Sequence, residues 1–101
     1  MMVNYAIFVR VEAKPDKEEE VAELLRSAQA MVEQEAGTPL WFAVRFSDTT
    51  FGIFDAFADS NSREDHLGGQ VAAALLAKAP ELFANQPLIE LADVIAAKTP
   101  S

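Results

Sequence analysis

The stretch at residues 51–67, FGIFDAFADSNSREDHL, contains an apolar strand, a polar turn and the first turns of a helix. Alternate side chains of a strand point to opposite faces. One face of this strand carries two aromatic, one aliphatic and one acidic residue: Phe51, Ile53, Asp55 and Phe57. The helix, for which residues 60–62 offer candidate N-caps, contains His66, the only histidine of the chain. A group that titrates near neutral pH therefore lies beside an aromatic strand, and the other segments are arranged around this junction.

A second strand, residues 40–47 (LWFAVRFS), comes before this stretch and is joined to it by the polar turn at 48–50. So short a connection predicts an antiparallel hairpin. Trp41 and Arg45 share one face of strand 40–47. Arg45 and Asp55 are then candidates for a cross-strand ion pair, worth roughly 0.2–1 kcal/mol.

The remaining segments follow the same kind of pattern. Asp16 and Glu19 have the spacing of a capping box, and Gly37 is a typical helix stop. We expect the other elements at these positions: a strand at 3–13, a helix from 16 to 37, a helix from 60 that is interrupted at 68–69 and resumes over 71–79, a short helical piece at 81–84 after Pro80, and a strand at 88–98. This order is the ferredoxin-like βαββαβ pattern of an α+β fold, with helices on one face of an antiparallel sheet.

The composition limits the classes of function. The chain has 101 residues, the size of one domain spanning 1–101. Its formal net charge of −8 repels a phosphate backbone, and no cluster of Lys and Arg offsets this, which argues against nucleic-acid binding. No apolar run approaches the roughly 18 residues that span a bilayer, and no secretory signal pattern is present. Because the chain has no cysteine, we expect a cytoplasmic protein.

Apolar side chains occupy both faces of the predicted hairpin. In strand 40–47, Phe42, Val44 and Phe46 alternate with Trp41 and Ala43. A sheet with one face in water should alternate between apolar and polar residues, and an exposed apolar sheet is a liability in a monomer. We therefore expect a homodimer in which this second face packs against another copy of the chain.

Three stretches resemble the antibiotic biosynthesis monooxygenase family of small dimeric α/β-barrel proteins. The first is residues 35–42 (EAGTPLWF), similar to the family's connection between its first helix and second strand. The second is residues 50–57 (TFGIFDAF) with the polar turn and His66 that follow, and the third is residues 71–83, which end in APELF. Together with the element order, the resemblance covers nearly the whole chain.

The resemblance implies a dimer whose two sheets form a shared barrel, with a cleft between helices and sheet in each subunit. Characterised members oxidise polycyclic aromatic phenols to quinones with molecular oxygen and without metal or flavin, so it implies no cofactor. Haem-degrading relatives rely on a histidine late in the second helix and an aromatic residue after the third strand. Lys78 or Ala79 lies near the first place here, and Ala58 and Asp59 near the second, which argues against haem chemistry.

His66 is the candidate catalytic residue. Its neighbours at helical spacing, Ser62, Arg63, Gly69 and Gln70, are not usual partners for zinc or iron, so we expect no metal site. As a general base, His66 suits the removal of a phenol proton, because the phenolate is the form that passes an electron to oxygen. The alternative is a structural role at the junction between sheet and helix, with His66 bonded to the backbone.

Five further residues are candidates for substrate binding: Trp41, Arg45, Asn4, Phe54 and Asp55. Trp41 is typical of core or dimer packing, and the alternative is a platform on which a planar ligand stacks. Arg45 offers a cation that orients a substrate oxygen anion.

Three functions remain open on the sequence alone. The first is a cofactor-independent monooxygenase that oxidises a small or polycyclic aromatic phenol to a quinone. The second is a non-enzymatic module that binds or senses a hydrophobic small molecule. The third is a structural homodimer whose cleft is filled by Trp41, Phe54 and Met31. A fold of this kind hosts unrelated functions, so the site has to decide between them.

Overall fold

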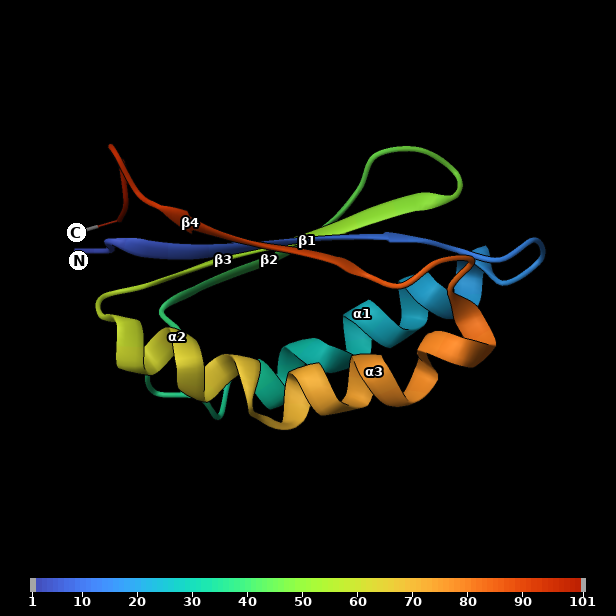
Figure 1. The fold of residues 1–101 in the computed structure, drawn as a ribbon, viewed down its shortest axis with the longest axis horizontal. Helices are drawn as coiled ribbons and strands as arrows, with labels where there is room; N and C mark the ends of the chain where they lie inside the picture. Colours follow the sequence, from blue (N-terminus) through green and yellow to red (C-terminus); the bar gives the residue numbers. More distant parts are fainter. Residues whose placement is uncertain (1, 101) are drawn as a thin grey trace.

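The computed structural model describes residues 2–100, in which four strands form one sheet and three helices lie together on one side of it (Figure 1). In chain order the elements are β1 (Tyr5–Glu12), α1 (Glu18–Val32), β2 (Leu40–Arg45), β3 (Thr50–Phe57), α2 (Ser60–Leu67), α3 (Gln70–Leu82) and β4 (Leu88–Asp93). The predicted ferredoxin-like α+β fold is confirmed.

The sheet is antiparallel throughout and has the strand order β2-β3-β1-β4. The predicted hairpin is present as β2 and β3. Its register pairs Trp41 with Asp55 and Arg45 with Phe51, so the expected cross-strand pair between Arg45 and Asp55 is wrong. The turn that closes the hairpin sets this register, and it places Arg45 beside the start of β3 rather than beside its end.

The start of α1 differs from the prediction. Asp16 has a φ of 68°, which is the left-handed region, and Lys17 occupies the N-cap position without a side-chain cap bond. The capping box expected between Asp16 and Glu19 is therefore wrong. The first turn instead carries three consecutive glutamates, residues 18–20, whose charges complement the positive end of the helix dipole.

The end of α1 also differs, because the helix stops at Val32 and not near Gly37. The loop at 33–39 then turns back toward α2. A Cβ at Gly37 would lie 3.0 Å from the Oγ atom of Ser62, so a glycine here relieves a tight contact where the loop approaches α2. This loop places Glu35 next to the core.

The helical region after β3 begins with a cap at Asp59, whose side chain accepts a hydrogen bond from the Ser62 amide at 2.8 Å. The cap therefore precedes the predicted range of 60–62. α3 continues through Pro80 to Leu82, so the separate helical piece expected after Pro80 is part of it. Among residues 2–100, no helix has the length and apolar character needed to cross a membrane.

The first and last strands of the chain are shorter than predicted. β1 covers Tyr5–Glu12 within the expected range of 3–13. β4 ends at Asp93, opposite Tyr5, and does not reach residue 98. Among the described strands β4 pairs with β1 alone, so its ladder ends close to the point where β1 begins.

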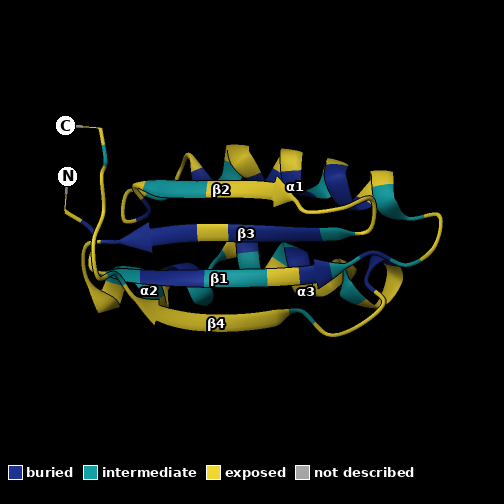
Figure 2. Ribbon diagram, turned by 90° about the horizontal axis from the view of Figure 1, so that it is seen from above, coloured by how far each residue is buried: buried dark blue, intermediate teal, exposed yellow. Residues whose placement is uncertain are grey.

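The core lies between the sheet and the helices. β1 and β3, the two central strands, contribute most of the buried sheet residues (Figure 2). The largest fully buried side chains are Phe51, Phe57, Ile7, Val21, Val71 and Asp55. Asp55 is thus a carboxyl group in a set that is otherwise apolar, and a buried carboxylate needs a partner.

The opposite face of the sheet exposes apolar side chains. Each of the following is at least 41% exposed: Phe42, Val44, Phe46 and Phe54. Gly52 leaves room for one of these rings, because a Cβ there would lie 2.7 Å from the ring of Phe46. The expectation that another copy of the chain covers this face stays a prediction.

Candidate functional site

Asp55 and His66 meet at the junction between β3 and α2. Asp55 lies on the helix-facing side of β3 and is 1% exposed, and His66 is 7% exposed. The Nε2 atom of His66 is 3.0 Å from the Oδ2 atom of Asp55. The ring of Phe57 packs against the imidazole with its centroid 5.5 Å away, so water has little access to the pair.

Glu35 holds the other side of the same imidazole. Its Oε1 atom is 2.5 Å from the Nδ1 atom of His66, and the Thr38 hydroxyl donates to this oxygen at 2.8 Å. Both residues come from the loop that follows α1. The result is a continuous polar chain, Asp55–His66–Glu35–Thr38, in which each nitrogen of the imidazole faces a carboxylate.

Burial and charge shift the titration of two members of this chain. Burial raises the pKa of Asp55, and the charge of Glu35 adds to this effect, while His66 opposes it. Burial lowers the pKa of His66, but hydrogen bonds and charges from Asp55 and Glu35 outweigh it, so the pKa lies above its ordinary value. Groups this close titrate as a unit. An imidazolium held between two carboxylates is the state that these contacts favour.

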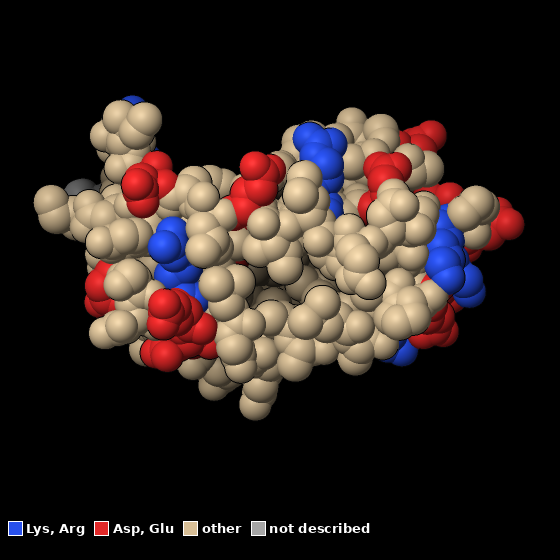
Figure 3. Space-filling model, viewed as in Figure 1, with Lys and Arg blue, Asp and Glu red and all other residues tan. Residues whose placement is uncertain are grey.

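A cavity of about 80 Å³ lies between the sheet and the helices α2 and α3, with Asp55 and His66 in its wall. Its other lining residues come mostly from the apolar faces of β1, β3 and α3, and Trp41 is among them. At its outer end stand Leu76 and Ile89, which are 53% and 46% exposed. The space-filling view shows a hollow between sheet and helices surrounded by uncharged residues (Figure 3).

A second, larger hollow of about 600 Å³ lies between α1 and the edge strand β2. Trp41 lines both hollows and stands between them. Glu35 and Thr38 line the larger one. The polar chain therefore runs from the wall of the cavity to the wall of this groove.

Three of the predicted site residues come together at the cavity: His66, Asp55 and Trp41. The Oδ1 atom of Asp55 and the Nε1 atom of Trp41 are both buried, and neither has a hydrogen-bond partner among residues 2–100. Trp41 and Asp55 are also opposite each other in the β2–β3 register. The structure thus places two unpaired polar atoms, one donor and one acceptor, on residues of the same wall.

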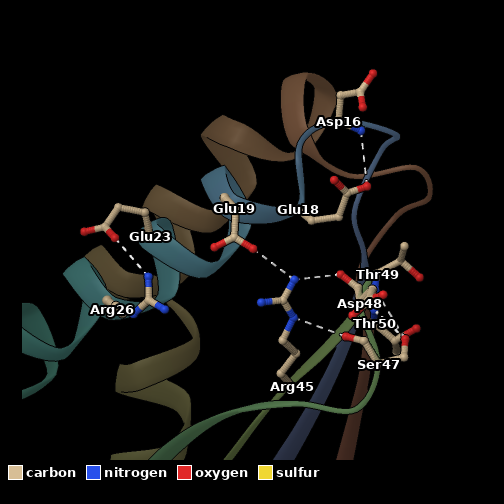
Figure 4. A network of polar contacts seen from close by, with 10 residues as sticks. All are labelled: Asp16, Glu18, Glu19, Glu23, Arg26, Arg45, Ser47, Asp48, Thr49 and Thr50. Atoms are coloured by element: carbon tan, nitrogen blue, oxygen red, sulfur yellow. Dashed lines mark hydrogen bonds and ion pairs between the residues drawn. The ribbon is translucent and has the colours of Figure 1, made fainter.

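The other predicted substrate-binding residues do not line this cavity. Arg45 lies at the hairpin turn, where it contacts Glu19 at 3.1 Å and donates to the carbonyl oxygens of Ser47 and Asp48 (Figure 4). It borders the groove beside α1 instead.

Asn4 and Phe54 are likewise elsewhere. The Asn4 amide donates to the carbonyl of Ala58 at 3.1 Å, which ties the start of the chain to the end of β3. Phe54 is on the opposite face of the sheet and 41% exposed. Placing Asn4, Phe54 and Arg45 in one cleft with His66 is therefore wrong.

Glu35 and Thr38 are the site residues that sequence reasoning missed. A search for partners of His66 at helical spacing cannot find Glu35, which is 31 positions away along the chain. The sequence feature that could have indicated them is Gly37. A glycine in a polar loop allows the loop to approach another element closely, and the residues next to the glycine in the chain then lie near that element as well. Among the described residues, no group of three or more His, Cys, Asp or Glu side chains is arranged to hold a metal ion.

Comparisons with known proteins give structural matches. No family model matches the sequence, and no curated protein matches it. A protein from Nitrosomonas europaea provisionally named an antibiotic biosynthesis monooxygenase superposes with a TM-score of 0.81 at 16% identity, over 91% of this chain and 99% of that chain. A protein from Caulobacter crescentus with the same provisional name gives 0.77 at 20% identity, over 93% and 92%. At these identities the likeness shows the fold.

One solved structure is much more similar. It is a protein of unknown function from Nitrosomonas europaea, 49% identical to this chain over 99% of this chain and 97% of that one, with a TM-score of 0.96. Identity at this level over the full length of both chains means common descent and the same arrangement of elements. The chain belongs to the same family as this Nitrosomonas europaea protein of unknown function.

Proposed function

We propose that the protein is a cofactor-independent monooxygenase whose substrate is a small phenol bound in the cavity between the sheet and the helices. One observation carries the proposal. Asp55 is a buried carboxylate in the wall of an apolar cavity, with one oxygen held by His66 and the other without a partner among the described residues. The shared fold with provisionally named monooxygenases supports the same class of reaction.

The roles of the two residues differ from the hypothesis based on sequence. Both nitrogens of His66 face carboxylates, so His66 has no free nitrogen with which to take a proton from a substrate. Asp55 has a free oxygen, and burial raises the pKa of its carboxyl, which brings it closer to the range of an effective general base. Asp55 is therefore the proposed base, and His66 is a positioning residue.

Charge balance makes this assignment consistent. Before reaction, two carboxylates and one imidazolium give the polar chain a net charge of −1. When the Oδ1 atom of Asp55 takes the phenol proton, the chain becomes neutral and the substrate becomes the anion. The negative charge moves a short distance within the cavity, and the nearby imidazolium stabilises it.

The overall reaction needs no cofactor to balance. The phenolate passes electrons to molecular oxygen, one oxygen atom becomes bonded to the ring carbon, and the ring carbon loses its hydrogen. The phenol and one molecule of oxygen thus give a quinone and one molecule of water. An apolar cavity suits this reaction, because it excludes water from the reactive intermediate.

The size of the cavity favours small substrates over polycyclic ones. Its volume is about 80 Å³, whereas a cavity of about 150 Å³ is known to take one benzene molecule. A substrate with a single ring can enter only if part of it projects past Leu76 and Ile89 at the outer end. A polycyclic phenol would require the helices to move away from the sheet.

Oxygen uptake tests the proposal. Phenols with one ring and anthrone, which has three, are incubated with the protein under air, and the rate without protein is subtracted. We expect uptake with at least one single-ring phenol, quinone formation with one water per oxygen consumed, and no uptake with anthrone. Binding of the phenols without any uptake would overturn the proposal in favour of a binding module.

Two variants test the assignment of the base. Asp55→Asn removes the charge and keeps the shape, and we expect kcat to fall by about 10²–10⁴-fold, the usual contribution of a general base. Asp65→Asn is the matched control, because Asp65 is exposed on α2, and its kcat should stay unchanged. Equal activity of the two variants would rule out Asp55 as the base.

A further inference from the structure

The register of the hairpin sets two different polar groups side by side. Trp41 on β2 and Asp55 on β3 are directly paired residues of adjacent antiparallel strands, so their side chains stand on the same face, next to each other. Both line the cavity. Their side chains also differ in kind, because an indole nitrogen can only donate a hydrogen bond and an ionised carboxylate can only accept one.

Each of these two side chains has a polar atom without a hydrogen-bond partner among the described residues. The Nε1 atom of Trp41 and the Oδ1 atom of Asp55 are buried without a partner among residues 2–100. Buried polar atoms are nearly always hydrogen-bonded, so an unpaired one calls for an explanation. Here one unpaired atom is a donor and the other an acceptor, and they belong to paired residues in one cavity wall. A single ligand that hydrogen-bonds to both atoms would explain both.

We infer that Trp41 and Asp55 recognise a small, uncharged molecule that carries a carbonyl oxygen beside an enol or hydroxyl group. The carbonyl accepts a hydrogen bond from the Trp41 indole, and the hydroxyl donates one to the free oxygen of Asp55. This inference rests on the proposed function, since it takes the cavity as the place where the ligand binds, and it narrows the phenols to those with a carbonyl next to the hydroxyl.

The rest of the site supports an uncharged ligand of this size. A carboxylate or phosphate would meet the Asp55 carboxylate in the cavity wall, and Glu35, on the other side of the His66 imidazole, adds a second acidic group nearby. The remaining wall is almost entirely aliphatic, which suits the carbon skeleton of the ligand. The volume of about 80 Å³ leaves room for a few heavy atoms around the two polar groups.

Acetylacetone is a suitable probe, because its enol form carries a hydroxyl and a carbonyl on carbons separated by one CH group, with the two oxygens side by side. Pentan-2-one is the matched control, with the same carbon chain, one carbonyl and no donor. Trp41 is the only tryptophan of the chain, so its fluorescence reports ligand entry at this wall. Titrations are performed under nitrogen, which separates binding from any reaction with oxygen.

We expect acetylacetone to quench Trp41 and to bind at least tenfold more tightly than pentan-2-one. Calorimetry then compares Trp41→Phe, which keeps an aromatic ring and loses the N–H donor. Both probes have a carbonyl that accepts from the indole, so this variant should bind both several-fold more weakly. It should keep the preference for acetylacetone, whose hydroxyl donates to Asp55. A thermal unfolding curve close to that of the unmodified protein shows that it is folded.

The outcomes separate this inference from the proposed function. Equal affinity for the two probes, or no binding of either, would overturn the inference and leave water as the partner of the two polar atoms. This holds even if a simple phenol is still oxidised. A clear preference for acetylacetone, together with weaker binding of both probes by Trp41→Phe, supports the inference. If no phenol is oxidised under air in that case, the recognition stands and the monooxygenase proposal fails.

Discussion

Two polar clusters of this molecule use the same kinds of residue and differ in their surroundings. At the hairpin end, Arg45 pairs with Glu19, whose side chains are 38% and 77% exposed. At the junction of β3 and α2, His66 pairs with Asp55, whose side chains are 8% and 1% exposed. Water screens the first pair and is largely excluded from the second. Burial, more than the number of contacts, makes the second cluster a candidate site.

The two clusters also differ in what remains unsatisfied. The Arg45 guanidinium has a carboxylate and two carbonyl oxygens as partners (Figure 4), and a cluster with its partners in place has little capacity left for a ligand. In the buried cluster, the Oδ1 atom of Asp55 lies at a cavity wall without a hydrogen-bond partner among residues 2–100. This one oxygen atom distinguishes the exposed ion pair from the cluster for which we propose a catalytic role.

The largest expected effect comes from breaking the buried cluster. His66→Ala leaves Asp55 and Glu35 facing each other without a cation, and removing one partner of a buried pair typically costs about 3–5 kcal/mol. We expect the free energy of unfolding, measured in urea at one fixed protein concentration, to fall by this amount. A loss below about 1 kcal/mol, the range of exposed pairs, would show that the cluster is not a buried ion pair.

The pH dependence of stability sharpens the comparison. The pKa of His66 is raised in the folded protein, so its stabilising contribution is complete below its unfolded pKa of 6.5 and is lost as pH rises through the folded pKa. The raised pKa of Asp55 acts in the same direction over a range that begins lower, above its ordinary value of 3.8, since ionisation is less favourable in the folded chain. The free energy of unfolding should therefore fall as pH rises above 6.5, by about 1.4 kcal/mol for each unit of difference in pKa.

A variant isolates the source of this slope. His66→Gln cannot titrate, so its free energy of unfolding should not show the decline that begins at pH 6.5. The Asp55 carboxyl remains in that variant, and a slope that persists at lower pH is assigned to its raised pKa. The same slope in both proteins would contradict the assignment to His66.

The smallest effect is expected at the exposed cluster. Glu19→Gln removes one charge from a pair that is mostly in water, so the free energy of unfolding should change by about 0–1 kcal/mol. Because exposed charges are screened by salt, the change should vanish in 1 M NaCl. A loss of several kcal/mol that persists in high salt would mean that this pair, too, is effectively buried.

The fold could be predicted because each element has its own local pattern. The alternation of Phe51, Ile53 and Phe57 predicts β3 without reference to any other segment, and apolar residues at helical spacing predict the helices in the same way. The residues at which the helices and strands begin and end were harder to predict. Asp16 looks like a helix cap, and its left-handed φ, which the sequence pattern does not reveal, moves the start of α1 to Glu18.

The site could be predicted only in part, because it depends on distances between elements. Asp55 and His66 lie on neighbouring elements and were found from the β3–α2 junction. Glu35 meets His66 only through the path of the loop after α1, which no periodicity describes. Arg45 was misplaced because the hairpin register, and with it the partner of each β2 residue, depends on the geometry of one turn.

The protonation state of His66 is the central claim, because it decides whether His66 or Asp55 can act as the base. His66 is the only histidine of the chain, so the ¹⁵N NMR signals of its ring need no assignment by mutation. We predict that at pH 6.5 more than half of the molecules carry a proton on both ring nitrogens. A ring that is mostly neutral at this pH, with one nitrogen bare, would contradict the account and return the role of base to His66.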